Sequence, residues 1–382
     1  MNSNKKPISI YIHWPFCESK CPYCDFNSHT QEGVDQDRWG RALLADLKYF
    51  KTKTEMHIVT SIFFGGGTPS LIRPEIIQLI VQTVKKWWQV HSNLEVTLEA
   101  NPSSSEIDKF QNYRIAGINR LSLGIQALNN SSLKFLGRKH TADEAVMAIE
   151  AGKKVFDRMS LDFIYALPQQ TVKHWEKELA KILAIAGDHL SLYQLTIEPG
   201  TLFHKNKIKA ASDPIAVELY QLTDVMTQEA GFKPYEISNY ARSGNESRHN
   251  LTYWLGGEYI GIGPGAHGRL INKKVAAAMY QIYNPTRWLH QVEEHGNGIA
   301  KSQNLTTTER IQELFMLGLR VSDGINRNRF KKQTGYDLND VINSKSLKTL
   351  IENGYICSDK TGIRASQKGK LYINTLVAQL VP

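Results

Sequence analysis

The sequence predicts an α/β fold in which parallel strands form an open partial barrel, followed by a smaller, mostly helical domain. A short β-branched run followed by a segment with helical periodicity recurs six times between residues 8 and 230. Such a series favours parallel strands with right-handed crossovers. Six units are too few for a standard eight-stranded barrel, so we expect a TIM-like partial (β/α)6 barrel. In addition, each run contains or leads into a polar or glycine feature, as expected where strands line a site.

The expected strands are short runs rich in Val, Ile, Leu and aromatic residues, bounded by turn residues. In chain order they cover residues 8–12, 58–64, 94–99, 118–126, 159–165 and 190–197. The expected helices have apolar residues at helical spacing. They cover residues 38–50, 74–90, 105–116, 142–156 and 172–186, with a further helix at 214–230.

Residues 232–270 have a different texture, with an aromatic group followed by the glycine-rich run 261–268. This run superficially resembles a dinucleotide fingerprint, but it opens no convincing helix, so we expect a loop that closes over the barrel mouth. The barrel and this closing segment are assigned to residues 1–280. An Asn-Pro pair and a His-Gly-Asn-Gly run indicate a connector at 281–304.

Residues 305–382 form a separate expected module, of normal size for a small domain. A capped helix runs from residue 307 to about 321. The remaining expected elements are helices at 326–334 and 338–353, a hairpin of 354–356 with 362–365, and a helix at 368–380. Three helices, a hairpin and a last helix are typical of a winged-helix-like domain.

The overall composition is that of an ordinary soluble globular protein. No apolar run approaches the roughly 20 residues that cross a bilayer. The apolar run at 8–12 is too short for a secretory signal and lacks a cleavage site, so we expect a cytoplasmic protein. The net charge of +9, from 46 basic and 37 acidic residues, suits nucleic acid, an anionic membrane face or a polycarboxylate ligand, and does not choose among them.

Three of the four cysteines, Cys17, Cys21 and Cys24, fall within eight residues. In a reducing compartment such a group binds metal rather than forming disulfides. Three thiolates on a four-iron cube leave one iron open for another ligand. A zinc site is the alternative, because His13 or His29 would complete a Cys3His set. The aromatic residue before the third cysteine, the place after a first strand and the nearby glycine run favour the cube.

The strand ends supply a candidate polar shell. The second strand leads into Gly-Gly-Gly-Thr-Pro at 65–69, where the backbone can approach an amino-acid-like ligand closely; a simple tight turn is the alternative. Glu99, Gln126 and Asp162 lie at or near the ends of later strands, and Arg138 follows the fourth. Carboxylates accept hydrogen bonds from ribose hydroxyls, and an arginine forks onto a carboxylate. For each residue taken singly, an ordinary solvated rim is the alternative.

His249 lies in a dense group with Asn250, Tyr253 and Trp254. An imidazole beside large aromatic rings is an axial haem ligand, an orienting group, or a buried histidine with both nitrogens satisfied. The sequence leaves these interpretations open.

Together these residues resemble a known family. Cys-x3-Cys-x2-Cys with an aromatic residue before the third cysteine resembles the cluster loop of radical S-adenosylmethionine enzymes. Tyr-Ile-His-Trp-Pro-Phe at 11–16 and the Gly-Gly-Gly-Thr-Pro run narrow this to the oxygen-independent coproporphyrinogen III oxidase group. Leu-Gly-Ile-Gln at 123–126, Arg138 and Asp-Phe-Ile-Tyr-Ala-Leu-Pro at 162–168 match as well, so the resemblance covers nearly the whole chain.

Two features separate this chain from the decarboxylase branch of that group, the HemN type. The decarboxylases have a long N-terminal extension and a further cysteine two residues after the trio, where this chain has Phe26. The run His-Asn-x-x-Tyr-Trp at 249–254 resembles the signature of the other branch, the HemW-type haem chaperones. The two differences from the decarboxylases and this signature all favour the chaperone branch.

The resemblance implies a [4Fe–4S] cluster on Cys17, Cys21 and Cys24, with S-adenosylmethionine chelating the open iron. It also implies a set of residues around the S-adenosylmethionine: Tyr11, Tyr23, Gly66, Gly67, Thr68, Glu99, Gln126, Arg138 and Asp162. Within this set, Tyr23 would contact the adenine. His249 is the candidate haem ligand.

We therefore expect a haem chaperone that binds haem, the cluster and S-adenosylmethionine, and delivers haem to acceptor haemoproteins. The alternative is radical oxidative decarboxylation of coproporphyrinogen III to protoporphyrinogen IX in porphyrin biosynthesis, which also needs an electron donor. The expected partners are haem or porphyrin and haem-accepting proteins. We do not expect nucleic acid as a partner, and peripheral membrane contact is compatible with the charge.

Overall fold

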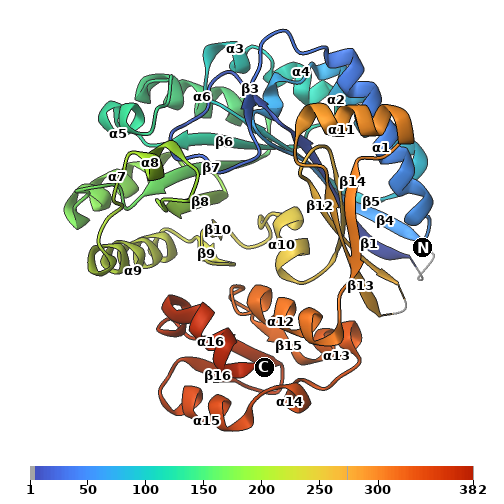
Figure 1. The fold of residues 1–382 in the computed structure, drawn as a ribbon. Helices are drawn as coiled ribbons and strands as arrows, with labels where there is room; N and C mark the ends of the chain where they lie inside the picture. The colour runs from blue at the N-terminus through green and yellow to red at the C-terminus, as the bar shows by residue number, and fades with distance from the viewer. Residues whose placement is uncertain (1–4, 273, 382) are drawn as a thin grey trace.

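The structure is a computed structural model that describes residues 5–272 and 274–381, the side chains of 104 and 105 excepted. Figure 1 shows an arc of strands with helices along its outer side. The C-terminal domain, orange to red, lies across the open side of the arc beside helix α10. The partial barrel and the small C-terminal domain expected from the sequence are therefore both present.

The six predicted strands are all present and lie next to one another in chain order, each parallel to the next. They are β1 (Lys6–Trp14), β4 (His57–Gly66), β5 (Gln89–Ala100), β6 (Arg120–Gln126), β7 (Arg158–Tyr165) and β8 (His189–Gln194). A seventh parallel strand, β11 (Glu258–Ile262), pairs with the free side of β1. It comes from the glycine-rich segment, which is therefore partly strand and not only a closing loop.

Antiparallel strands extend the sheet at both edges. On one side they are β12 (His267–Asn272), β13 (Val275–Gln281) and β14 (Ile299–Asn304), and on the other β10 (Asn239–Ala241) and β9 (Lys233–Pro234). In the described part of the chain the order ends with β14 and β9, which do not pair with each other. The barrel is thus open, as predicted.

The predicted barrel helices are α1 (Gln36–Lys53), α2 (Pro74–Trp87), α6 (Ala142–Val155), α7 (Val172–Ile185) and α9 (Asp213–Glu229). Helix α2 ends earlier than expected because Trp88 is already extended. The single helix expected at 105–116 is two helices, α3 (Ser104–Ile107) and α4 (Phe110–Ile115). The Glu106 side chain accepts a hydrogen bond from the Asn101 N–H and so contacts the turn that precedes α3.

Several short elements were not predicted, because one or two turns contain too few residues to show a period. They are β2 (Phe16–Cys17), β3 (His29–Thr30), α5 (Asn130–Phe135), α8 (Leu202–Lys205) and the 3-10 turn η1 (Pro69–Leu71). Helix α10 (Arg248–Trp254) contains the histidine–aromatic group and is capped by Ser247, whose side chain accepts from the Asn250 N–H.

The strands alternate between an apolar outer face and a polar inner face, following the two-residue period of β structure. Outward residues such as Ile10, Ile62 and Leu98 are fully buried under the helices. The inward residues line the interior of the barrel, which we call the lumen. They include Ser9, Ser61, Glu95, Thr97, Arg120, Ser122, Arg158, Ser160, Asp162, His189 and Ser191. The hydrophobic core therefore lies outside the sheet, and the lumen is left for polar groups.

Residues 281–304 differ from the expected connector, because they contain α11 (Pro285–His295) as well as strand β14. Helix α11 packs on α1, where the Trp39 and Trp288 rings stack with centroids 5.4 Å apart. The buried Asp46 carboxylate on α1 accepts from the Gln281 amide at 3.0 Å and from the Gly298 N–H at 3.4 Å. These contacts join residues far apart in sequence, so local composition did not reveal them.

The C-terminal domain has its own core and a three-stranded antiparallel sheet, where the sequence predicted only a hairpin. Its elements are α12 (Thr307–Gly318), β15 (Ile325–Asn326), α13 (Arg327–Thr334), α14 (Leu338–Val341), α15 (Ser344–Glu352), β16 (Ile356–Ser358), β17 (Gly362–Ala365), η2 (Gly369–Tyr372) and α16 (Ile373–Leu380). The additional strand is β15, whose two residues pair with the strand after the hairpin turn.

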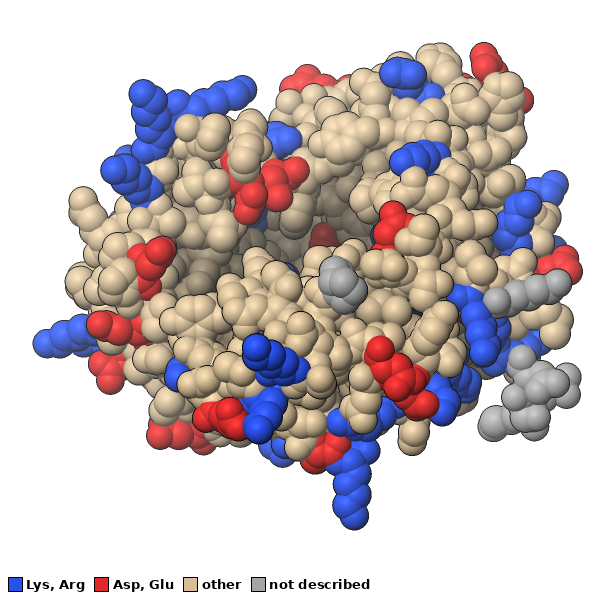
Figure 2. Space-filling view, turned by 60° about the horizontal axis from the view of Figure 1, so that its bottom comes forward, with Lys and Arg blue, Asp and Glu red and all other residues tan. Residues whose placement is uncertain are grey.

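Figure 2, which brings the lower side of Figure 1 forward, shows Lys and Arg interspersed with Asp and Glu around a central hollow. The excess positive charge thus forms no single patch on this face. Among the described residues, no helix is both long and apolar enough to cross a membrane.

Candidate functional site

A cavity of about 470 Å³ opens at the carboxyl ends of the parallel strands. Its walls include eleven of the residues predicted from the sequence: Cys17, Cys21, Tyr23, Cys24, Gly66, Gly67, Thr68, Glu99, Gln126, Arg138 and Asp162. They converge because parallel strands bring their carboxyl ends to one edge of the sheet. Two predicted residues, Tyr11 and His249, are not among the lining residues.

The cysteines lie on a loop between two very short strands, β2 and β3, which pair in parallel and close its base. Asn27 ties this cluster loop (residues 17–28) to the barrel, because its amide donates to the carbonyl oxygens of Pro264 at 3.0 Å and Tyr283 at 2.8 Å. The Lys20 ammonium group spans the loop and donates to the carbonyl of Ser28 at 3.0 Å. These protein contacts help to hold the loop in shape.

The three thiols are half-buried at the cavity wall. Burial raises the pKa of both the Cys17 and the Cys24 thiol. The Arg138 guanidinium lies 3.5 Å from the Cys21 sulfur, where it can balance the charge of a thiolate. The site thus offers three soft ligands with a positive group beside one of them.

The donor set fits a cluster better than a single ion. Across the described residues, no three His, Cys, Asp or Glu side chains lie close enough together to hold one metal ion. The His13 and His29 rings, the candidates for completing a zinc site, each bond Asn27 instead, at 2.9 and 2.8 Å. Three cysteines that line one cavity suit a cube, which takes outer ligands on separate irons.

The glycine run passes so close to neighbouring backbone that side chains are excluded. Gly66 has φ +117°, and a Cβ there would lie 2.8 Å from the Trp14 carbonyl oxygen; at Gly67 it would lie 2.7 Å from that of Phe16. The Gly66 N–H donates to the Glu99 carboxylate at 3.2 Å. The run thus exposes backbone to the cavity and also orients an acidic side chain.

Two carboxyl groups form the floor of the cavity. Burial, and then the nearby charge of Asp162, raise the pKa of Glu99 to about 8. Burial also raises the pKa of Asp162, although Ser122 and Ser160 each donate to its carboxylate at 2.8 Å. A proton therefore resides near this pair in neutral solution, and ligand hydroxyls there find acceptors already oriented by hydrogen bonds.

The sequence missed Asn101, which connects several parts of the site. Its side-chain oxygen accepts from Arg138 at 2.6 Å, and its amide lies 3.4 Å from the Thr68 hydroxyl. Arg138 also donates to the Gly124 carbonyl at 3.0 Å. The available signal was its position, two residues after Glu99 at the end of a strand and just before a proline.

Gln126 and Tyr23 complete the cavity wall. Gln126 has φ +70° and ends β6 at an irregularity in the strand register, a conformation that non-glycine residues adopt at a cost of about 1–3 kcal/mol. The Tyr23 ring packs near Phe203, with centroids 6.4 Å apart, and burial raises the pKa of its hydroxyl. Tyr23, within the cluster loop, thus adds an aromatic ring to the cavity wall.

Tyr11 and His249 lie deeper, in the lumen. The Tyr11 hydroxyl is 3.0 Å from His13 Nδ1, so this residue supports the start of the cluster loop. Both ring nitrogens of His249 have partners: Nδ1 is 2.9 Å from the Ser61 hydroxyl and Nε2 is 2.6 Å from the Tyr253 hydroxyl. Burial, and then the charge of Arg120, lower the pKa of His249 to about 3, so the ring is neutral. The geometry is that of a satisfied buried histidine.

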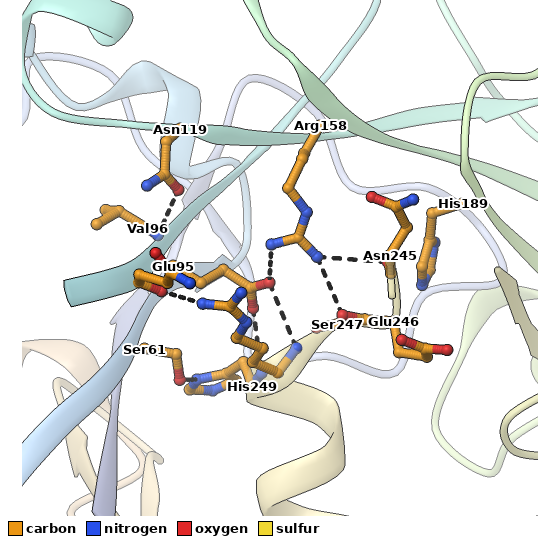
Figure 3. Close-up of polar contacts among 12 residues, drawn as sticks. Ser61, Glu95, Val96, Asn119, Arg158, His189, Asn245, Glu246, Ser247 and His249 are labelled. Carbon is orange, nitrogen blue, oxygen red and sulfur yellow. Dashed lines mark hydrogen bonds and ion pairs between the residues drawn. The ribbon is translucent and has the colours of Figure 1, made fainter. Parts of the chain in front are cut away.

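A buried ion pair places the helix that carries His249. Figure 3 shows the Glu95 side chain between Arg158 and the first turn of α10. Its carboxylate accepts from Arg158 at 2.6 Å and from the backbone N–H groups of Arg248 at 3.3 Å and His249 at 3.1 Å. A carboxylate at a helix N-terminus accepts hydrogen bonds from the unpaired N–H groups and interacts favourably with the helix dipole. Helix α10 is therefore held against the lumen.

Two family models match the chain. Residues 11–182 match the radical SAM superfamily, and residues 305–372 match the HemN C-terminal domain. Among solved structures, the coproporphyrinogen III oxidase (HemN) from Escherichia coli, described as a radical SAM enzyme, superposes with a TM-score of 0.83. That likeness covers 98% of this chain and 90% of the other at 21% identity, and it shows the shared fold.

Relatives at higher identity extend along nearly the whole chain. The chain is 36% identical to the Radical S-adenosyl methionine domain-containing protein 1, mitochondrial, of Mus musculus, over 98% of this chain and 87% of that protein. It is 36% identical to the Heme chaperone HemW of Escherichia coli (strain K12), and 35% identical to that of Haemophilus influenzae. Each of these two comparisons covers 97% of both chains.

Proposed function

Because this chain belongs to the radical SAM superfamily and carries a HemN C-terminal domain, we propose that it is a haem chaperone of the HemW type. In this proposal it binds haem beside a [4Fe–4S] cluster and S-adenosylmethionine, and it delivers the haem to acceptor haemoproteins. The cluster and S-adenosylmethionine follow from the superfamily. The haem and its delivery are the proposed part.

The observation that carries the proposal is the likeness to proteins named heme chaperone HemW, which extends over both domains. Phe26 supports it. This residue lies in the cavity wall and is 57% exposed. The resemblance places a further cysteine at this position in the decarboxylase branch. An exposed aromatic ring suits contact with a flat apolar ligand, whereas it cannot ligate iron.

The residues predicted around the cluster and S-adenosylmethionine each have a role under this proposal. Cys17, Cys21 and Cys24 would hold the cluster, which when reduced supplies the electron that cleaves S-adenosylmethionine in this superfamily. Backbone groups at Gly66 and Gly67 would meet the amino-acid end of the bound molecule. A separate set, Thr68, Glu99, Gln126, Arg138 and Asp162, would bind its polar groups, and Tyr23 would face the adenine. Tyr11 would act indirectly, by positioning His13.

The test is a haem titration of the purified, anaerobically reconstituted protein, followed by transfer to an apo-haemoprotein. We expect a saturable change in the haem absorption spectrum at one haem per chain. Holo-haemoprotein should then appear faster from the loaded chaperone than from the same concentration of free haem. Absence of saturable binding, or transfer no faster than from free haem, would contradict the proposal.

The decarboxylase alternative is decided in the same sample. Coproporphyrinogen III, a reductant and S-adenosylmethionine are added under anaerobic conditions, and protoporphyrinogen IX is measured. We expect no product beyond the level obtained without S-adenosylmethionine. Multiple turnovers would assign the protein to porphyrin biosynthesis and would also require an electron donor.

The proposed partners are haem-accepting proteins, and the proposed compartment is the cytoplasm. A reducing compartment preserves the three thiols that the cluster needs. Nucleic acid is not part of the proposal, because the charges on the face shown in Figure 2 are mixed in sign. Peripheral membrane contact remains compatible with the net charge of +9.

A further inference from the structure

The lumen contains a buried arginine without a partner. Arg120 lies on β6 on the same face as Ser122 and Gly124, which line the cavity, and therefore points into the lumen one step deeper. Only 2% of its surface is exposed. No hydrogen bond or ion pair joins its guanidinium to any of the residues that the structure describes. A buried guanidinium normally has its donors paired, so this one calls for a ligand.

The polar groups around Arg120 are already engaged with one another. Glu99 accepts from the Gly66 N–H, and Asp162 accepts from two serines. His189 is bonded through both ring nitrogens, to Ser160 and Tyr235, at 2.8 Å each. His249 is likewise bonded through both nitrogens. The neighbours thus leave the guanidinium fork of Arg120 free.

Rings on the inner side of the barrel are partly exposed, and no Arg120 nitrogen is among the fully buried polar atoms without a partner in the described residues. Tyr193, whose side chain projects from β8 into the cavity, is 41% exposed, and Tyr11, Phe63 and Tyr253 are half-buried. Arg120 is close enough to Glu99 and Asp162 that its charge opposes the rise that burial causes in the pKa of each. Arg120 is not itself among the residues that line the cavity, so the free fork lies beneath the floor formed by Glu99 and Asp162.

We propose that the Arg120 guanidinium binds a carboxylate group of a ligand that reaches into the lumen, and that this carboxylate is a propionate of the haem. A planar fork pairs with a carboxylate through two parallel hydrogen bonds. A doubly charged phosphate is disfavoured there, because the single positive charge of Arg120 balances only one negative charge and a buried second one would be unpaired. This inference rests on the proposed haem binding and adds the group that orients the haem.

The test compares haem with its dimethyl ester, in which both propionates are capped, by titrating each into the reconstituted wild-type protein. We expect haem to bind about 10- to 100-fold more tightly than the ester, the range for a charge-assisted pair of hydrogen bonds. In Arg120→Met this ratio should fall to near one, mainly through weaker haem binding. Because the ratio is taken within each protein, general damage to the variant cancels.

Arg158→Met is the matched control. Arg158 is the register neighbour of Arg120 on the next strand and also faces the lumen, but it is already paired with Glu95. We expect this variant to keep the wild-type ratio even if both affinities fall. Arg120→Lys, which keeps the charge and loses the fork, should give an intermediate ratio.

The outcomes separate this inference from the proposed function. Wild-type protein that binds neither haem nor ester contradicts both. Equal binding of the two compounds supports haem binding and overturns the role of Arg120, as does a ratio that survives Arg120→Met. A wild-type ratio near one, together with loss of S-adenosylmethionine binding in Arg120→Met, identifies that molecule as the source of the carboxylate and overturns the propionate assignment.

Discussion

The protonation of Glu99 couples the cavity to the stability of the fold. Its pKa is about 8 in the folded protein against an ordinary value of 4.5, because burial and then Asp162 disfavour its charge. The folded state therefore holds a proton that the unfolded state releases above pH 4.5, so the free energy of unfolding falls as the pH rises from 4.5 to 8. We expect Glu99→Gln to reduce this fall in the ligand-free protein by about 1–3 kcal/mol. Urea titrations at the two ends of the range measure it.

The control is Glu75→Gln, which changes an exposed carboxylate on α2. It should leave the pH dependence of the wild type intact. If Glu99→Gln shows the same pH dependence as the wild type, the carboxyl group does not carry the proton assigned to it.

The hydrogen bonds of His249 allow a haem-ligand role and a structural role to be distinguished by mutation. Its Nε2 is available to a haem iron only if the Tyr253 hydroxyl gives up its hydrogen bond. If His249 is the ligand, Tyr253→Phe should bind haem at least as tightly as the wild type, and His249→Ala should lose the binding. We expect Tyr253→Phe to lower the free energy of unfolding by about 1–3 kcal/mol, because a buried partner is left unpaired.

Haem spectra and urea titrations of these two variants provide the measurement. Haem binding that persists in His249→Ala would remove His249 from the haem site. It would leave the ring with the structural role that its two hydrogen bonds describe.

At the scale of elements, the cluster loop depends on one asparagine. Asn27 connects the loop to the segments around Pro264 and Tyr283, and its side-chain oxygen also meets His29. Asn27→Ala removes three buried or part-buried hydrogen bonds, which we expect to loosen the loop and lower the iron and sulfide retained after reconstitution by at least half. Iron and sulfide analysis after gel filtration measures this.

Asn112→Ala, at an exposed position on α4, is the matched control and should retain the wild-type iron content. Full retention by Asn27→Ala would mean that the cysteines and the β2–β3 pairing suffice to shape the loop. In that case the Pro264 and Tyr283 contacts would serve only the packing of the barrel edge.

At the scale of the molecule, the C-terminal domain makes polar contacts with the turn that follows α10. Arg310, 5% exposed, donates to the Gly256 carbonyl at 2.6 Å and pairs with Glu313 at 2.5 Å. Gln333 donates to the Leu255 carbonyl at 2.9 Å. The helix that carries His249 is thus covered on its other side by the domain, as Figure 1 shows.

We expect Arg310→Met to weaken this docking by about 2–4 kcal/mol, because the variant loses the buried guanidinium and its hydrogen bonds to Gly256 and Glu313. All seven tryptophans precede residue 305, so tryptophan fluorescence reports on the barrel while circular dichroism reports on both domains. The two signals should give separate urea midpoints in the variant and coincide in the wild type. Coincident midpoints in the variant would show that the remaining contacts, among them the Arg269–Glu313 ion pair, suffice to couple the domains.

Much of the fold could be predicted from local patterns. The six strands and most of the barrel helices follow from residue periodicity, which is a property of neighbours in the chain. Strand β11 was missed because its pairing with β1 joins residues 250 positions apart. The strand and helix in 281–304 were missed for the same reason, since Asp46 and Trp39 on α1 hold them in place.

The candidate site likewise has features that follow from the sequence and features that only the structure decided. The sequence by itself determined which groups meet at the cavity, because parallel strands carry their ends to one edge and the cysteine spacing specifies a soft ligand set. Only the tertiary structure decided which side chains face the cavity and which lie beneath it. It placed Tyr11 and His249 in the lumen, added Asn101 to the wall, and left Arg120 without a partner. These outcomes depend on contacts between distant strands and helix α10, and no local pattern encodes such contacts.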